Sequence, residues 1–170
     1  MRVLGIDPGT IAMGYGVVES SDGNTVFIDC GVLKTSSRSS IGERLYFLYT
    51  NLMDIISKVR PDIVAVEQPF VAKNAKSAFA IGRAQAVVIL TAASSDIPVS
   101  EYTPTEIKQR VTSYGASSKE QVQEMVRLQL GLEYAPEPHD ASDALAVALC
   151  HLSESHVNSL LSGQQKREGK

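Results

Sequence analysis

The chain begins with Met1-Arg-Val-Leu-Gly-Ile-Asp7-Pro8-Gly9-Thr10, in which a short apolar run leads into Asp-Pro-Gly. The apolar residues between Val3 and Ile6 predict a short buried strand. Asp7 ends that strand, and Pro8-Gly9 turns the chain away. A carboxylate is therefore expected where a buried strand meets solvent. Asp before Pro-Gly is also a common turn residue, so Asp7 alone does not identify a site.

The composition is that of an ordinary globular domain. The 170 residues are 44% hydrophobic and 21% charged, which suits one domain with its own core. The net charge is −3, so binding to nucleic acid would require the 16 Lys and Arg residues to gather on one face. Cys30 and Cys150 form no metal-ligand or disulfide pattern, and no apolar run approaches membrane-spanning length. We expect a cytoplasmic protein with no membrane partner.

Five short apolar runs predict strands, at residues 1–7, 14–20, 25–33, 62–67 and 97–99. Short links join the first three strands, which favours an antiparallel meander. A long helix precedes the fourth strand, so that strand is expected to join through a right-handed crossover and to pair in parallel. Pro98 cannot donate to a ladder, which puts the fifth strand at an edge. These runs predict an α/β fold with a mixed five-stranded sheet flanked by helices.

Helices are predicted over residues 41–59, 74–94, a short segment from 103, 117–130 and 140–155. Capping boxes begin three of them, and the pairs are Ser40 with Glu43, Thr103 with Glu106, and Ser117 with Glu120. No composition shift divides residues 1–155, which we expect to form a single domain. The stretch from Gly163 has no apolar content to pack, and residues 156–170 are expected to form a mobile tail.

Four carboxylates occupy positions that suggest a common site. Glu67 ends its strand as Asp7 ends its own, and neighbouring strands would bring both to one edge of the sheet. A Glu that closes an apolar strand is unusual, because a buried acid needs a partner. Asp140 and Asp143 lie three residues apart in the first turn of the last helix and share a face. The alternative for that pair is a favourable charge at a helix N-terminus without any site.

Converging carboxylates point to metal chemistry. They would repel one another and raise their own pKa values, and a divalent cation removes that cost. Hard oxygen ligands select Mg²⁺ or Mn²⁺ over zinc. Two such ions about 3.5–4 Å apart can activate a water and stabilise the leaving oxygen in phosphodiester hydrolysis. His139 precedes Asp140, and three roles stay open for it: orienting water, binding a metal, or lying exposed.

Basic, aromatic and small residues provide further candidates. Phe70 follows Glu67 on a loop, where an aromatic ring either stacks on a base or packs locally. The candidates for a phosphate-binding rim are Lys73, Lys76, Arg83, Lys108, Arg110 and Lys119, although a single lysine or arginine is more often a solvated surface charge. Ala78, Gly82 and Ala86 line one face of the helix over 74–94, which suits either core packing or a two-fold interface.

Three stretches resemble the signatures of the RuvC family of bacterial Holliday-junction resolvases. They are Leu4-Gly-Ile-Asp7-Pro-Gly9, Glu67-Gln-Pro-Phe70-Val-Ala-Lys-Asn74 and His139-Asp-Ala-Ser-Asp143-Ala-Leu145, and the similarity spans about residues 1–155. The resemblance implies a ribonuclease-H-like fold, a homodimer and Mg²⁺-dependent cleavage of four-way DNA junctions by paired symmetric nicks. It places the protein in homologous recombination and DNA repair, as a partner of the RuvA–RuvB branch-migration machine.

The resemblance also implies roles for particular residues. By matching position, the metal ligands and catalytic residues would be Asp7, Glu67, Asp140 and Asp143, holding two Mg²⁺ ions for which Mn²⁺ can substitute. Phe70 matches an aromatic residue that contacts DNA, and Lys108 and Lys119 match basic residues near the scissile phosphate. Together with Lys73 and Lys76 of the basic rim, they are the expected DNA-binding residues. The helix over 74–94 matches the dimer-interface helix, so the interface would include Ala78, Gly82 and Ala86.

The sequence departs from the family pattern in two places. The loop before Lys119 often reads Gly-x-Gly with a following Arg, whereas Ser113 and Ala116 stand there in this chain. The third acidic position varies between Asp and His in the family, so we assign it to Asp140 and leave His139 open.

Two other classes of function are compatible with parts of the sequence. A sugar-kinase or actin-like ATPase also has Asp-x-Gly in its first phosphate loop, which Asp7-Pro-Gly9 with Gly14 resembles. Such enzymes need two lobes, and 170 residues supply one. A non-catalytic junction-binding module would be expected to lack one of the carboxylates, and none is missing.

Overall fold

A computed structural model describes residues 1–21, 23–68 and 75–168 of the chain, with the side chains of all of these except 75, 76 and 159–168. Its strands are β1 (Arg2–Asp7), β2 (Ala12–Ser21), β3 (Asn24–Lys34), β4 (Ile63–Glu67) and β5 (Val99–Tyr102). They form one five-stranded sheet in the order β3-β2-β1-β4-β5. The first three strands pair antiparallel, and β4 and β5 continue the sheet in parallel with β1. The predicted mixed sheet is confirmed.

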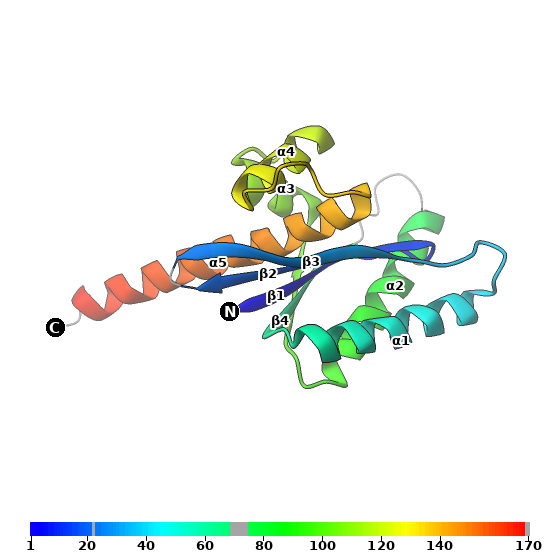
Figure 1. Cartoon of the computed structure of the whole chain (residues 1–170). Coiled ribbons are helices and arrows are strands. Elements are labelled where there is room, and N and C mark those ends of the chain that lie inside the picture. The colour runs from blue at the N-terminus through cyan, green and yellow to red at the C-terminus, as the bar shows by residue number, and fades with distance from the viewer. Residues whose placement is uncertain (22, 69–74, 169–170) are drawn as a thin grey trace.

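Helices cover both faces of this sheet. They are α1 (Ile41–Val59), α2 (Ala75–Ala93), α3 (Pro104–Thr112), α4 (Lys119–Gln129) and α5 (His139–Glu168). Figure 1 shows α1 and α2 on one face, and α5 on the other with α3 and α4 outside it. The C-terminal part of α5 extends past the end of the sheet. Because α5 lies between the sheet and two helices, its residues 144–150 are all apolar and all buried.

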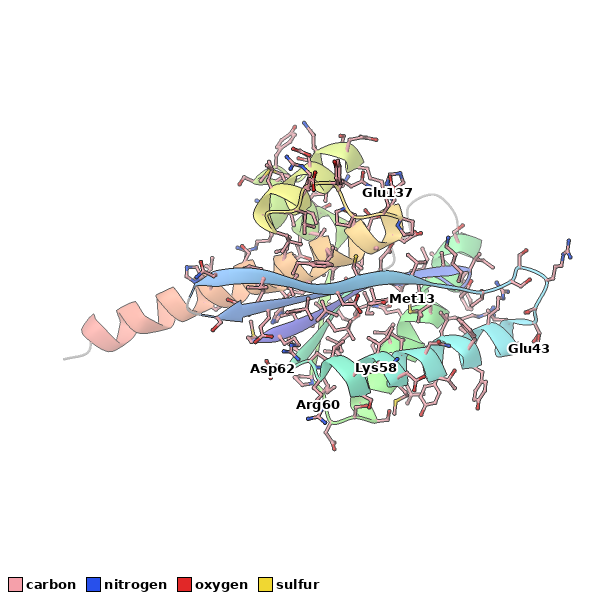
Figure 2. The ribbon with its side chains drawn as sticks, viewed as in Figure 1. Met13, Glu43, Lys58, Arg60, Asp62 and Glu137 are labelled. Atoms are coloured by element: carbon pink, nitrogen blue, oxygen red, sulfur yellow. The ribbon has the colours of Figure 1, made fainter. Side chains whose placement is uncertain are left out.

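Local sequence sets the bounds of α1. The Ser40 hydroxyl accepts from the Glu43 amide at 3.3 Å, and the Glu43 carboxylate accepts from the Ser40 amide at 2.7 Å, which is the predicted capping box. Arg60 ends the helix in the left-handed conformation, with φ of 47°. Figure 2 shows Glu43 at the start of α1 and Lys58 near its end, so both charges complement the helix dipole. The helix buries Leu48, Leu52 and Ile56 against the sheet.

Strand alternation decides which side chains face which helices. Leu4 and Ile6 of β1 enter the core under α1 and α2, together with Met13 of β2, which Figure 2 shows between sheet and helices. Because side chains alternate along a strand, Gly5 and Asp7 face α5. The same alternation in β4 puts Val64 and Val66 under α1 and α2 and turns Ala65 and Glu67 toward α5. The alternation of side chains along β1 and β4 therefore turns both strand-end carboxylates, Asp7 and Glu67, toward α5.

A track of three glycines, Gly5, Gly14 and Gly16, lets α5 approach the sheet closely. Gly5 pairs with Gly16 across β1 and β2, and Gly14 pairs with Asp7. A Cβ at Gly16 would lie 2.6 Å from Leu145 Cγ and 2.7 Å from its backbone nitrogen. A Cβ at Gly5 or Gly14 would overlap the carbonyl oxygen of Ala144 or Asp140. Any larger residue on this track would push α5 away from the strands.

The structure corrects three predicted boundaries. The edge strand runs over Val99–Tyr102 and not over 97–99, because Pro98 has no N–H and contributes only its carbonyl, which accepts from the Val64 amide at 3.0 Å. The N-cap of α4 is Ser118 with Gln121, not Ser117 with Glu120. Ser117 is instead buried, and its hydroxyl donates to the Tyr114 carbonyl at 2.8 Å.

The third correction concerns the last helix, which continues to Glu168 and does not end near Ser155. Helix propagation costs little once a packed segment supplies the nucleus, and many of the added residues are good helix formers. The prediction placed the end of the helix too early because it relied on apolar content alone. The mobility of residues 156–170 stays a prediction.

The glycine track gives a first prediction. Gly5→Ala should lower the free energy of unfolding by on the order of 3 kcal/mol, because the new Cβ would meet backbone atoms of α5 that cannot move alone. Urea unfolding followed by circular dichroism measures the change. Gly42→Ala is the matched control: a Cβ there meets nothing within 4 Å, and alanine should stabilise α1 by up to about 1 kcal/mol. Equal stability of the two variants would show that α5 does not depend on this contact.

Candidate active site

Asp7 and Glu67 lie side by side at the carboxyl edge of the sheet. The β1–β4 register pairs Ile6 with Val66, so the next residue on each strand is one of these acids. Both are partly buried. The sequence predicted that neighbouring strands would deliver these two carboxylates together, and the register does so.

Asp140 and Asp143 reach the same edge from α5. The helix begins at His139, so Asp140 is in its first turn and Asp143 follows one turn after His139, where the second turn begins. A Cβ at Gly14 would lie 3.3 Å from the Asp140 Cβ, which shows how closely the helix start passes β2 beside Asp7. The charges of both acids act on Asp7 and raise its pKa. The four predicted carboxylates therefore gather at one place.

Burial and mutual repulsion make this edge electrostatically unfavourable when all four acids are ionised. Burial is the largest cause that raises the pKa of Asp7 from 3.8 to about 7, followed by the charges of Asp143 and Asp140. Burial, then the charges of Asp7 and Asp143, raises the pKa of Glu67 from 4.5 to about 7. Such strongly shifted groups clustered at one edge are typical of a functional site.

Two lysines supply the nearby positive charge. Nζ of Lys119 forms an ion pair with Oδ2 of Asp143 at 2.6 Å, and this contact raises the pKa of Lys119. The charge of Lys119 lowers the pKa values of Asp7 and Glu67, and Lys108 acts in the same direction on Glu67. Both lysines line a cavity of about 200 Å³ beside Glu67 and Asp143, with an apolar back wall. The cavity is thus lined by carboxylates, ammonium groups and apolar side chains.

The donor set fits a hard divalent cation. Carboxylate oxygens are the ligands that Mg²⁺ and Mn²⁺ prefer, and a cation would remove the repulsion that raises the pKa values of Asp7 and Glu67. Within the part of the chain that the structure describes, no three His, Cys, Asp or Glu side chains stand close enough to hold a metal in the arrangement seen. Asp143 is paired with Lys119 in that arrangement, so its carboxylate would have to exchange partners.

The other predicted residues divide into three groups. Lys108 and Lys119 line the site cavity. Phe70 and Lys73 lie outside the described residues, and Lys76 belongs to α2 without a described side chain. Ala78, Gly82 and Ala86 lie on α2 and are not among the residues that line the site cavity.

Sequence reasoning missed two features that shape the site. The first is the glycine track, although alternating glycines inside a strand pattern signal close backbone approach. The second is a hydrogen bond from Nε2 of Gln123 to Nδ1 of His139 at 2.7 Å, which joins α4 to α5. No local sequence pattern predicts this hydrogen bond, because its two residues belong to different helices.

Comparisons with known proteins agree on one family. A family model described as crossover junction endodeoxyribonuclease RuvC matches residues 3–151. A Dehalococcoides mccartyi protein of that name is 49% identical over 162 residues, covering 95% of this chain and 97% of the relative. A Roseiflexus protein of that name is 50% identical, covering 88% and 89%. The solved structure of Thermus thermophilus RuvC with a Holliday junction substrate superposes with a TM-score of 0.87 at 34% identity, covering 93% of this chain and 96% of that one.

The raised pKa values predict how metal-free stability depends on pH. The folded state keeps a proton on Glu67 up to about pH 7, whereas the unfolded chain releases it near pH 4.5. Stability should therefore fall as pH rises between those values. Glu67→Gln removes this cost, so with chelator present it should exceed the wild type by on the order of 2 kcal/mol at pH 8 and by almost nothing at pH 4. Urea unfolding at both pH values measures this difference.

Glu133→Gln, at an exposed position, serves as the control and should match the wild type at both pH values. A Glu67→Gln variant that is less stable than the wild type at pH 8 would contradict the electrostatic argument.

Proposed function

The chain belongs to the RuvC family of crossover junction endodeoxyribonucleases, and we propose that it resolves four-way DNA junctions by hydrolysing phosphodiester bonds. The observation that supports this most directly is the convergence of four carboxylates and two lysines at the carboxyl edge of the sheet. Neither an ATPase nor a binding module accounts for the family match together with a full set of acids.

The proposed metal ligands are Asp7, Glu67, Asp140 and Asp143. Two divalent cations, Mg²⁺ or Mn²⁺, would supply charge neutralisation and an acidified water at this site when bound. Asp7 and Glu67 come from rigid neighbouring strands, so their carboxylates are preorganised relative to each other. Water adds to phosphorus while the bond to one bridging oxygen breaks, and that oxygen leaves with a proton as one of the two ligatable ends.

The lysines of the site would bind the DNA backbone. Lys119 and Lys108 lie beside the carboxylates, where an ammonium group can hold a phosphate oxygen and oppose the negative charge that builds up there. Phe70, Lys73 and Lys76 complete the proposed DNA-binding set on the segment after β4. Because the whole chain carries a net charge of −3, these local cations must dominate the approach of DNA, and binding should weaken steeply with salt.

We also propose a homodimer formed through α2, since paired nicks need two sites. Phe79 and Leu90 on this helix are 69% and 63% exposed, so α2 leaves apolar surface that a second copy could cover. Gly82 lies between them in sequence, and a Cβ there would meet nothing within 4 Å in the protomer. Small residues at Ala78, Gly82 and Ala86 would allow a second α2 to approach closely about a two-fold axis.

The proposed cellular setting follows from the family. We propose a bacterial, cytoplasmic protein that acts in recombination and repair with the RuvA–RuvB branch-migration complex. Separately, none of the helices in the described ranges combines the length and apolar character needed to cross a bilayer.

Cleavage tests the proposed function directly. Asp7→Asn should slow Mg²⁺-dependent nicking of a mobile four-way junction by on the order of a thousand-fold, because it removes a charge on which the site depends. Junction affinity should stay within about twofold, because binding rests on the cationic residues. Asp54→Asn, an exposed acid of α1, is the control and should cleave normally. Retained cleavage by Asp7→Asn, or cleavage of linear duplex as fast as junction, would refute the assignment.

The interface has its own test. Gly82→Leu should weaken dimerisation by tenfold or more, roughly the effect of overpacking a close helix contact, and should uncouple the two nicks. Sedimentation over a range of concentrations measures the dimer. Gly42→Leu is the matched control, because both glycines have open space within the protomer. An unchanged dimer in Gly82→Leu would exclude α2 as the interface.

A further inference from the structure

Two polar contacts join the N-terminal parts of α4 and α5. Lys119 on α4 pairs with Asp143 on α5, at 2.6 Å between Nζ and Oδ2. Four residues further along α4, Nε2 of Gln123 donates to Nδ1 of His139 at 2.7 Å. Only the first of these contacts involves the carboxylate site. The second uses two side chains to which the proposed function assigns no role.

The spacing of these two contacts means that together they fix the position of α4 on α5. Lys119 and Gln123 are four residues apart, and so are Asp143 and His139, so each pair lies on one face of its helix. The two contacts are separated by about 6 Å along each helix axis. The earlier residue of α4 contacts the later residue of α5, and the later contacts the earlier. Sliding or rotating α4 against α5 would therefore break at least one of the two contacts.

Hydrogen bonds such as that between the Thr112 and Ser117 hydroxyls, at 2.7 Å, tie the start of α4 to the end of α3. Between α4 and α5 themselves, the remaining packing is apolar. Val122 and Val126 of α4 are buried in the same apolar cluster as Leu145 and Leu149 of α5. Apolar burial holds the helices together but tolerates small rotations. The Lys119 side chain is 53% exposed and long, so packing does not fix its direction. The position of its ammonium group therefore depends on how the first turn of α4 is held.

We propose that Gln123 and His139 are positioning residues, whose hydrogen bond holds the first turn of α4 so that Lys119 stays over the carboxylate site. This inference rests on the proposed function, because Lys119 matters there as the cation beside the scissile phosphate. His139 thereby acquires a role that is neither metal binding nor proton transfer. The hydrogen bond acts on the reaction only through Lys119.

Single-turnover cleavage of a saturating junction tests this role. Gln123→Leu should lower the rate about tenfold and leave the junction Kd within about twofold, since the charge of Lys119 is kept but misplaced. His139→Ala should lower the rate by the same factor. Gln123→Glu should restore most of the rate, because a carboxylate can accept from the imidazole. No loss in Gln123→Leu, or a far larger loss in His139→Ala, would overturn the proposal.

Two controls separate positioning from general damage. Gln129→Leu removes another α4 side-chain hydrogen bond, from Nε2 to the Val111 carbonyl at 2.8 Å, and should leave the rate within twofold. In a Lys119→Gln background, Gln123→Leu should cause no further loss, because the residue through which it acts is gone. Independent, multiplicative losses would instead show that Gln123 does not work through Lys119.

Amide hydrogen exchange provides a readout that does not need cleavage. Gln123→Leu should speed exchange of the Val122 amide, which donates to the Ser118 carbonyl at 3.2 Å in the first turn of α4, by at least threefold. Gln129→Leu should not change it. If the wild type failed to cleave junctions, the proposed function would fall while this exchange difference still tested the hydrogen bond. Unchanged exchange in Gln123→Leu would overturn the positioning role.

Discussion

Close contact between α5 and the strands β1 and β2 is the constraint on which the rest of the structure depends. It exists because Gly5, Gly14 and Gly16 present bare backbone to the helix. This contact brings the first turn of α5 to the end of β1, so Asp140 and Asp143 reach the acids at the sheet edge. It also fixes the platform on which α3 and α4 pack, so the position of Lys119 depends on the same glycines.

The fold holds mutually repelling carboxylates together at the site, which is electrostatically unfavourable. Burial and repulsion raise the pKa values of Asp7 and Glu67 to about 7, and the lysines relieve only part of that cost. A fold selected for stability alone would not place four acids together. The apolar layers on both sides of the sheet compensate, because they bury large side chains such as Leu4, Ile6 and Leu145 completely. Strain of this kind, supported by a stable scaffold, is expected where chemistry occurs.

The two acids at the sheet edge and the lysine beside them are held by different kinds of element. Asp7 and Glu67 are held by a parallel strand pair in the middle of the sheet. Lys119 is held by a short helix that packs on α5 through a few apolar residues and two polar contacts. Both strands are paired with a neighbour on each side, which fixes the backbone of these two acids, whereas the place of the Lys119 ammonium group depends on how α4 packs against α5.

Short-range sequence patterns were enough to predict the local features. The capping boxes at Ser40 and Thr103, the strand ends at Asp7 and Glu67, and the mixed sheet all follow from short-range patterns, because turn chemistry and alternation act within a few residues. The same patterns suggested that the acids converge, and the resemblance of three stretches to one family added their assignment as metal ligands. Where local signals were weak the boundaries shifted, as at β5, which begins after Pro98, and at α5, which continues to Glu168.

The way in which distant elements meet depends on the packing of the whole fold. The glycines of β1 and β2 select the face on which α5 lies, and that contact links residues more than a hundred positions apart. The pairing of Lys119 with Asp143, and of Gln123 with His139, depends on the rotation of one helix against another. Periodicity shows which face of a helix is apolar, but not which partner it packs against or at what angle. Those contacts form only when the whole core closes, which is why they had to be read from the structure.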